Sequence, residues 1–405
     1  MAVNLPPLPE LHPVPGIRLG TVRAQIRKKD RRDLVVIECA PGTQVAAVFT
    51  QNRFCAAPVT VAREHLDKTA TRALLINTGF ANAGTGPEGM GDARQSCVAL
   101  AAIMGCAPQA VLPFSTGVIG ERLPIDRLVA GLPGCVSALS ANGWAEAAHG
   151  IMTTDTLPKG SSRQVMIDGR IVTVTGIAKG AGMICPNMAT LLAFVATDAS
   201  VAPAVLQQCL QTAADASFNR ISVDGDTSTN DSCVLLATGK SGLEIRTADS
   251  SAYSAFCDAV RDVLAELAQA IVRDAEGATK FITIDVVQGA SQDDCLEVAH
   301  TIAHSPLVKT AFFASDPNWG RILAAVGRAR IPQLNVDRVS IHLDDVCIVR
   351  NGGRAADYSE AQGQAVMAKP EIQVRVELGA GTASARLWTC DLSHDYVTIN
   401  AEYRT

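Results

Sequence analysis

Short apolar runs rich in β-branched residues alternate along this chain with segments whose apolar residues recur every three or four positions. The first kind is typical of buried strands and the second of amphipathic helices, so their alternation predicts a mixed α/β fold. The strands are expected at residues 34–40, 45–50, 73–79, 167–178, 190–199 and 280–287. The helices are expected at residues 92–105, 203–216, 251–275, 295–303 and 319–329. An alternating pattern at residues 371–392, centred on Gly379 and Gly381, predicts a β-hairpin.

The length of the chain allows more than one domain. A chain of 405 residues commonly forms two or three domains. Because 48% of the residues are apolar and 19% are charged, the chain can bury enough surface to offset the entropy of ordering. The best candidate boundary follows the long helix at residues 251–275. We therefore expect one domain at residues 1–280 and a second at residues 281–405.

The charge balance and the cysteine pattern exclude several partners and ligands. The chain has 35 basic and 40 acidic residues, so it lacks the basic excess that follows a phosphate backbone, and no nucleic acid is expected to bind. It has no apolar run of about 18 residues and no secretory signal, so we expect a cytoplasmic protein without a membrane partner. Its twelve cysteines and seven histidines are dispersed, so we expect reduced thiols and no metal site.

Two short motifs resemble ligand sites but fit them poorly. Residues 84–89 match the GxGxxG pattern of dinucleotide-binding loops, yet Pro87 removes a backbone donor and no acidic ribose partner follows at the usual distance. A plain glycine-rich loop is the better interpretation. Asp224 resembles the start of a calcium loop, but Thr229 and Leu235 stand where glycine and glutamate are required. A turn rich in Asx hydrogen bonds is the better interpretation.

Residues 179–194 form the most unusual stretch of the sequence. A lysine and two glycines precede a proline turn, which leads through Ala189 and Thr190 into an apolar strand. In the ordinary interpretation, Thr190 is simply a β-branched strand residue. In the functional one, Thr190 Oγ attacks the Ala189 carbonyl, and an N→O shift followed by hydrolysis leaves Thr190 as a new N-terminus. Its α-amine, with an ordinary pKa of about 7.7–8.0, would then serve as the base for the same hydroxyl. The spacing alone does not decide between them.

Nine motifs in order along nearly the whole chain show a resemblance to one known family. They are FTQNRFCAAPV at 49–59, INTGFANAGTG at 76–86, STGVIGERLP at 115–124, MTTDTLPK at 152–159, KGAGMICPNMATLLAFVATDA at 179–199, SVDGDTSTNDS at 222–232, EGATKF at 276–281, DPNWGRI at 316–322 and DYVTINAEYRT at 395–405. In these motifs the chain resembles the ornithine acetyltransferases, the glutamate N-acetyltransferases of arginine synthesis. They are self-cleaving N-terminal-nucleophile enzymes.

The resemblance implies a fold and an assembly. The fold would be an αββα-type layered N-terminal-nucleophile-like core at residues 1–280, distinct from the main Ntn-hydrolase fold. A smaller C-terminal α/β domain at residues 281–405 would return its tail to the active site. Autocatalytic cleavage would give an α chain of residues 1–189 and a β chain of residues 190–405, expected to form an α2β2 heterotetramer.

The resemblance also implies a reaction. The enzyme would be an acyltransferase that moves the acetyl group from N2-acetylornithine to glutamate through an acetyl-Thr190 intermediate, giving ornithine and N-acetylglutamate. No cofactor is implied. Acetyl-CoA is a further candidate donor, and its use would make the enzyme an N-acetylglutamate synthase as well.

The resemblance carries over to individual site residues. Thr190 would be the nucleophile, with cleavage after Ala189, and Thr116 and Gly117 would form the oxyanion hole with a hydroxyl and a backbone N–H. The substrate-binding residues implied are Thr153, Lys179, Thr190, Glu276, Asn400 and Thr405. Each also has an ordinary interpretation, since a lysine in a glycine-rich loop is usually solvated and C-terminal residues are usually frayed.

Two alternative functions would give different experimental results. In an Ntn-type aminopeptidase or amidase of related fold, water would take the acyl group, and an assay with and without glutamate would reveal it. A non-catalytic amino-acid-binding protein would stay intact at the Ala189–Thr190 bond, as a gel would show. One departure from the family concerns a pocket wall, because Phe80 stands where the family has a polar asparagine.

Overall fold

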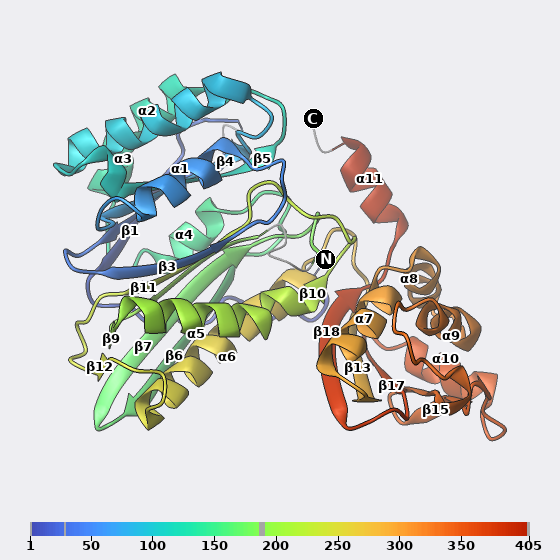
Figure 1. The fold of residues 1–405 in the computed structure, drawn as a ribbon. Coiled ribbons are helices and arrows are strands. Elements are labelled where there is room, and N and C mark those ends of the chain that lie inside the picture. The colour runs from blue at the N-terminus through green and yellow to red at the C-terminus, as the bar shows by residue number, and fades with distance from the viewer. Residues whose placement is uncertain (1, 28–29, 186–190, 403–405) are drawn as a thin grey trace.

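The computed structural model describes residues 2–27, 30–185 and 191–402, and its larger part is built on two sheets that face each other (Figure 1). The first sheet has the strand order β1-β2-β4-β5 and the second has the order β3-β11-β8-β7-β6. The strands of the first sheet are β1 Ile17–Val22, β2 Leu34–Cys39, β4 Ala73–Phe80 and β5 Val111–Val118. Those of the second are β3 Gln44–Phe49, β6 Lys159–Ile167, β7 Arg170–Lys179, β8 Leu192–Thr197 and β11 Ser232–Ala237.

Helices cover the outer face of each sheet, so the larger part has four αββα layers (Figure 1). Apolar residues of α2 and α3 pack on the first sheet, and those of α5 and α6 pack on the second. The helices are α1 Ala57–Leu66, α2 Gly86–Met104, α3 Ile125–Ser137, α4 Trp144–Gly150, α5 Pro203–Asp215 and α6 Ser251–Arg273. The predicted mixed α/β class with an αββα-type layered core is confirmed.

Apolar side chains between the two sheets form the central core. Phe114 of β5 and Phe194 of β8 meet edge to face with their ring centroids 5.1 Å apart, and Trp144 of α4 packs into the same cluster. Strands β8 and β11 are buried along their whole length, as expected of central strands covered on both faces. This core holds the ends of β4, β5 and β7 in fixed positions.

The longest helix, α6, lies against the outer face of the second sheet. Ser250 Oγ accepts a hydrogen bond from the N–H of Tyr253 and so caps the helix N-terminus. Its buried face packs on β6 and β7. Within the described ranges, no helix combines the length and the apolar character needed to cross a membrane.

A third sheet of seven strands, in the order β10-β18-β13-β17-β14-β15-β16, has its own apolar core drawn from residues 282–387. Its strands are β10 Ile221–Ser222, β13 Phe281–Gly289, β14 Ser340–Leu343, β15 Val346–Arg350, β16 Gly353–Arg354, β17 Glu371–Glu377 and β18 Ala383–Cys390. The helices of this part are α7 Gln292–Ala303, α8 Pro306–Phe313, α9 Trp319–Gly327, α10 Glu360–Met367 and α11 His394–Glu402. The short strands β9 Ser200–Val201 and β12 Glu244–Ile245 pair with each other elsewhere. Strand β10 belongs to this sheet although it comes from residues before 281. The domain limits 1–280 and 281–405 therefore stay a prediction.

Two predicted elements differ from the structure. The helix expected from residue 92 begins six residues earlier, at Gly86, because Pro87 suits the first helical turn, where no N–H partner is needed. The hairpin predicted at residues 371–392 is wrong, since β17 and β18 both pair with β13, which lies between them. Alternation identifies strands and their faces, but it carries no information on a partner inserted from elsewhere in the chain.

Candidate active site

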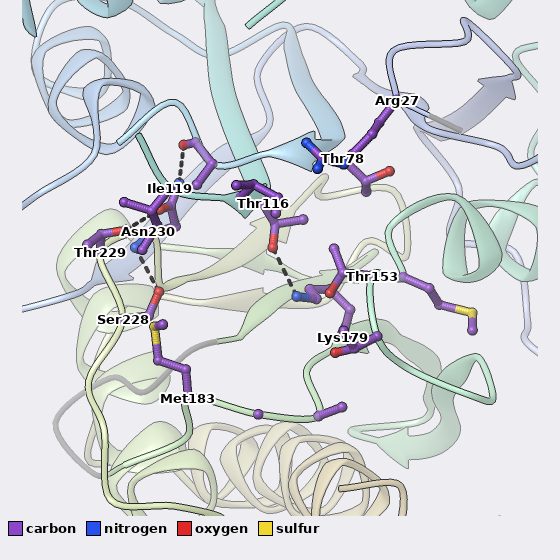
Figure 2. Close-up of a pocket in the computed structure, with 18 of the residues that line it drawn as sticks. Arg27, Thr78, Thr116, Ile119, Thr153, Lys179, Met183, Ser228, Thr229 and Asn230 are labelled. Atoms are coloured by element: carbon purple, nitrogen blue, oxygen red, sulfur yellow. Dashed lines mark hydrogen bonds between the residues drawn. The ribbon is translucent and has the colours of Figure 1, made fainter. Parts of the chain in front are cut away.

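A pocket of about 200 Å³ lies where β4, β5 and β7 end (Figure 2). The structure brings six predicted site residues together on its walls, namely Thr116, Gly117, Thr153, Lys179, Glu276 and Asn400. The other three, Ala189, Thr190 and Thr405, lie outside the described residues. The roles of all nine residues stay predictions.

Lys179 and Thr116 join the two sheets inside this pocket. Lys179 ends β7, and its Nζ donates a hydrogen bond to Thr116 Oγ1 of β5 over 2.9 Å (Figure 2). Both residues are buried, with exposed fractions of 4% and 6%. Because an ammonium group can only donate, the Thr116 hydroxyl accepts this bond and keeps its own proton to donate to another oxygen. The contact therefore suits a hydroxyl that stabilises an oxyanion.

Gly117 lies next to Thr116 at a point where only glycine fits. Its φ is +134°, and it is paired with Gly79 of the parallel strand β4. A Cβ atom at position 117 would overlap the carbonyl group of Gly79. The facing glycines let the two backbones approach closely at the pocket wall. A glycine at this position is thus required by the fold as well as suited to a backbone donor.

Asp155 organises the loops around the lysine. Its Oδ1 accepts hydrogen bonds from the Gly180 N–H over 2.8 Å and Lys159 Nζ over 2.7 Å, and its Oδ2 accepts from the Thr153 N–H over 2.9 Å. Burial by itself would raise the pKa of Asp155, but Lys159 and Lys179 beside it hold that pKa well below its usual range. The buried carboxylate therefore stays ionised and links the Thr153 loop to the segment after Lys179.

The ammonium group of Lys179 is balanced between burial and nearby carboxylates. Burial lowers the pKa of Lys179 from its ordinary value, while Asp155, Glu276 and Asp231 favour its charged form. An anionic group entering the pocket would add to the stabilisation of the ammonium. Lys179 is accordingly suited to bind the carboxylate of a small substrate.

Glu276 supplies a carboxylate on another wall. The Glu276 N–H donates to the carbonyl of Ala181 over 2.9 Å, and Glu276 Oε2 accepts from Asn400 Nδ2 over 2.8 Å. Asn400 belongs to α11, so the C-terminal helix reaches the pocket. A Cβ atom on Gly182 would overlap the Glu276 carboxylate, so glycine leaves space for it. This wall is suited to an ammonium group of a substrate.

Asp231 was missed by the sequence analysis. The residue is fully buried just before β11, and its Oδ1 accepts from the N–H of Leu191 over 3.0 Å. Burial raises the pKa of Asp231 well above its usual value. Among the described residues, its Oδ2 has no hydrogen-bond partner. Asp231 also favours the charged form of Lys179, so it belongs to the surroundings of the site.

Asp155 was also missed, although a signal for both acids was present. Each lies inside a motif quoted for the family resemblance, MTTDTLPK for Asp155 and SVDGDTSTNDS for Asp231. Asp155 also stands four residues before Lys159, its ion-pair partner. Acidic residues inside the family motifs were therefore the signal.

The two motifs that were set aside form a hydrogen-bonded turn and the start of a helix. Asp224 accepts hydrogen bonds from the N–H groups of Met183, Ile184 and Asp226, the last being an Asx turn. The glycine-rich loop leads into helix α2.

All twelve cysteines are free thiols. In the described part of the chain, no group of three or more His, Cys, Asp or Glu residues could hold a metal ion.

Four layers in the order αββα, with a polar pocket at the strand ends, define a layered α/β protein with a candidate active site. The sequence matches the model of the ArgJ family over residues 18–405. It is 57% identical over 406 aligned positions, covering all of both chains, to the arginine biosynthesis bifunctional protein ArgJ of Pseudomonas syringae pv. tomato. It is 61% identical over 395 positions, 98% of this chain and 97% of the relative, to the protein of that name in Methylococcus capsulatus. The chain belongs to the ArgJ family.

Solved structures with similar sequences cover about half of this chain. The arginine biosynthesis bifunctional protein argJ from Bacillus halodurans is 36% identical, with a TM-score of 0.49, over 51% of this chain and 97% of that one. The ornithine acetyltransferase from Mycobacterium tuberculosis, solved with ornithine, is 35% identical, with a TM-score of 0.38, over 43% of this chain and 92% of that one.

Proposed function

We propose that this protein moves an acetyl group from N2-acetylornithine to glutamate in arginine biosynthesis. The observation that carries the proposal is the Lys179–Thr116 contact beside Gly117. The Thr116 hydroxyl and the Gly117 N–H would be two oxyanion donors in one pocket. The same pocket holds charged residues for both ends of an acetylated amino acid. Relatives that are 56–61% identical and named arginine biosynthesis bifunctional proteins support this reaction.

In the first half-reaction, Thr190 acts as nucleophile and base. Cleavage after Ala189 frees its α-amine, which takes the proton of Thr190 Oγ as that oxygen attacks the acetyl carbonyl. The carbonyl oxygen becomes an anion, which the Thr116 hydroxyl and the Gly117 N–H stabilise. The carbon–nitrogen bond then breaks, ornithine leaves with the proton, and the acetyl ester stays on Thr190.

The second half-reaction reverses these steps with another amine. The α-amine of glutamate attacks the ester carbonyl, the same two donors hold the oxyanion, and N-acetylglutamate leaves. Acetyl-CoA is a second donor for the same ester, which suits the word bifunctional in the relatives' names. Covalent transfer of this kind needs no cofactor, because the hydroxyl carries the acetyl group between substrates.

Different charged residues of the pocket bind the carboxylate and the ammonium groups of the substrates. Lys179 and Thr153 bind the carboxylate of the substrate, to which the Lys179 ammonium and the Thr153 hydroxyl donate hydrogen bonds. Glu276 binds ammonium groups together with Asn400, its hydrogen-bond partner. Thr405, which the family resemblance implies, is a further substrate-binding residue. Opposite charges on separate walls let one pocket orient a zwitterionic amino acid.

Cleavage would divide the protein into two chains that remain associated. The α chain of residues 1–189 and the β chain of residues 190–405 stay together, since β7 and β8 pair along six residues of one sheet. Two such pairs form an α2β2 heterotetramer in the cytoplasm. Small molecules are the substrates.

An acetyl-transfer assay tests the proposal. Purified protein is given N2-acetylornithine with and without glutamate, and N-acetylglutamate and free acetate are measured. Formation of N-acetylglutamate only when glutamate is present supports the transferase. Release of acetate at the same rate without glutamate would instead identify an amidase.

A further inference from the structure

Two arginines that the sequence analysis did not single out, Arg27 and Arg31, also line the pocket. Arg31 Nη1 donates to the carbonyl of Thr153 over 2.6 Å, so this guanidinium ties two walls together. Arg27 lines the pocket near Thr78 (Figure 2), and Gly79 lines it as well. Its side chain is 22% exposed, so its positive charge is partly shielded from water. The pocket thus has a cationic wall in addition to Lys179.

The backbone before Arg27 is held in place by a carboxylate. Asp33 accepts hydrogen bonds from the N–H of Ala24 over 2.7 Å and of Ile26 over 2.6 Å, and the Arg27 N–H bonds to it as well. A short segment fixed at three amides projects its side chain in a defined direction. Arg27 therefore stands at the end of a segment whose backbone Asp33 holds in place.

The side chain of Arg27 is also positioned by its neighbours. Arg27 Nη1 donates to Glu121 Oε2 over 2.7 Å, and its guanidinium carbon lies 5.2 Å from the centre of the Phe80 ring. A Cβ atom on Gly79, whose φ is +99°, would come within 2.8 Å of Arg27 Cβ, so glycine allows the arginine stem to pass. Phe80 is the residue that departs from the family pattern, and the structure makes it the platform for this guanidinium.

The proposed substrates explain what such a group would recognise. Ornithine and glutamate share their α-amine and α-carboxylate, and they differ at the end of the side chain, where one has an ammonium and the other a carboxylate. Glu276 suits the ammonium. A planar guanidinium suits a carboxylate, because its N–H groups form a fork that matches the two oxygens.

We propose that Arg27 is a specificity-determining residue that binds the side-chain carboxylate of the acceptor glutamate. The inference rests on the proposed function, since it presumes an acetyl-enzyme that chooses between two amines. Arg31 and Lys179 donate to Thr153 and Thr116 of the pocket, whereas Arg27 is held by Glu121 and Phe80. Arg27 thus matters for the second half-reaction and little for the first.

Two acceptors compared on one acetyl-enzyme test this assignment. The enzyme is loaded with N2-acetylornithine, and kcat/KM is measured for glutamate and, by isotope exchange, for labelled ornithine. In Arg27→Met, kcat/KM for glutamate should fall about 10- to 150-fold, the effect of losing a hydrogen bond to a charged group. The value for ornithine should stay within about twofold, because this acceptor has no side-chain carboxylate.

Two further variants complete the experiment. Arg27→Lys keeps the charge but loses the planar fork, so a smaller loss confined to glutamate is expected, and this variant serves if Arg27→Met does not mature. Arg32→Met is the matched control, because Arg32 lies in the same basic run and pairs with Glu146 outside the pocket. It should leave both values unchanged.

The outcomes separate this inference from the function on which it rests. An equal loss for both acceptors, or no loss for glutamate, in an enzyme that still forms the acetylated fragment would overturn the role of Arg27 alone. A wild-type enzyme that forms no acetylated fragment would overturn the acetyltransferase itself.

Discussion

The ammonium of Lys179 donates to the hydroxyl of Thr116 over 2.9 Å, across the ends of two strands that belong to different sheets. The bond turns the threonine oxygen into an acceptor and directs its proton elsewhere. Each residue therefore depends on the other. Lys179 orients the hydroxyl, and the hydroxyl satisfies part of a buried charge.

The Thr116 hydroxyl is expected to act in the transition state. Thr116→Val should lower kcat about 100- to 1,000-fold with little change in KM, the effect typical of removing one oxyanion donor. Thr116→Ser, which restores a hydroxyl, should recover much of the loss. Steady-state kinetics with N2-acetylornithine and glutamate measure both.

A matched control separates this effect from loss of packing. Thr21 lies in the same sheet with the same 6% exposure, and its hydroxyl donates to the Leu34 carbonyl outside the pocket. Thr21→Val should leave kcat within a few-fold of wild type. A similar loss in both variants would refute the oxyanion role.

Glu276 is expected to bind substrate and not to make or break bonds. Glu276→Gln should raise KM for N2-acetylornithine with a smaller change in kcat, and kcat/KM should fall about 30- to 150-fold. Glu266→Gln, on helix α6 away from the pocket, is the control, because Glu266 pairs with Ser161 and Arg163. An unchanged KM with a collapsed kcat would place Glu276 in catalysis.

Asp155 is expected to stabilise the fold in a pH-dependent way. Its folded pKa is depressed, so its contribution is fully present above the unfolded value of about 3.8 and is lost as the pH falls below it. Breaking a buried ion pair costs about 3–5 kcal/mol, so Asp155→Asn should lower the free energy of unfolding by that amount at pH 7. The difference in the free energy of unfolding between Asp155→Asn and the parent protein should become smaller below about pH 3.8.

Chemical denaturation of the uncleaved Thr190→Ala protein provides the measurement, since both variants are then single chains. Asp357→Asn is the control, because Asp357 forms an exposed pair with Arg350 and its removal should change little. A gap between Asp155→Asn and the parent that stays constant with pH would argue against an ionised Asp155.

The mixed α/β class and part of the fold could be predicted from local patterns, while the wrong hairpin and the missed site residues share one cause. Apolar periodicity located the strands β2, β3, β4, β7, β8 and β13 and the long helix α6, but it did not identify β1, β5 or β6. The family motifs led to Lys179, Thr116 and Glu276. The wrong hairpin at residues 371–392 depends on β13, which comes from about ninety residues earlier in the chain. Asp231 and Arg27 were missed for the same reason, because a buried acid and a pocket arginine are defined by distant neighbours such as Leu191 and Phe80.

Self-cleavage is expected to depend on the Thr190 hydroxyl. Purified wild type should run on a denaturing gel as two fragments that separate between Ala189 and Thr190. Thr190→Ala should stay a single chain and lose acetyl transfer, because it lacks both the attacking oxygen and the freed α-amine. N-terminal sequencing of the β fragment identifies the cleavage site, and the sequence should begin at Thr190. A full-length wild type with full activity would refute the need for cleavage.

The most direct test of the account is the intact mass of the enzyme after brief incubation with N2-acetylornithine alone. A covalent acetyl ester should add about 42 Da to the β fragment of residues 190–405 and nothing to the α fragment. Adding glutamate should remove this mass and yield N-acetylglutamate. Acetyl transfer that needs both substrates together, with neither fragment ever gaining mass, would contradict the acetyl-Thr190 intermediate.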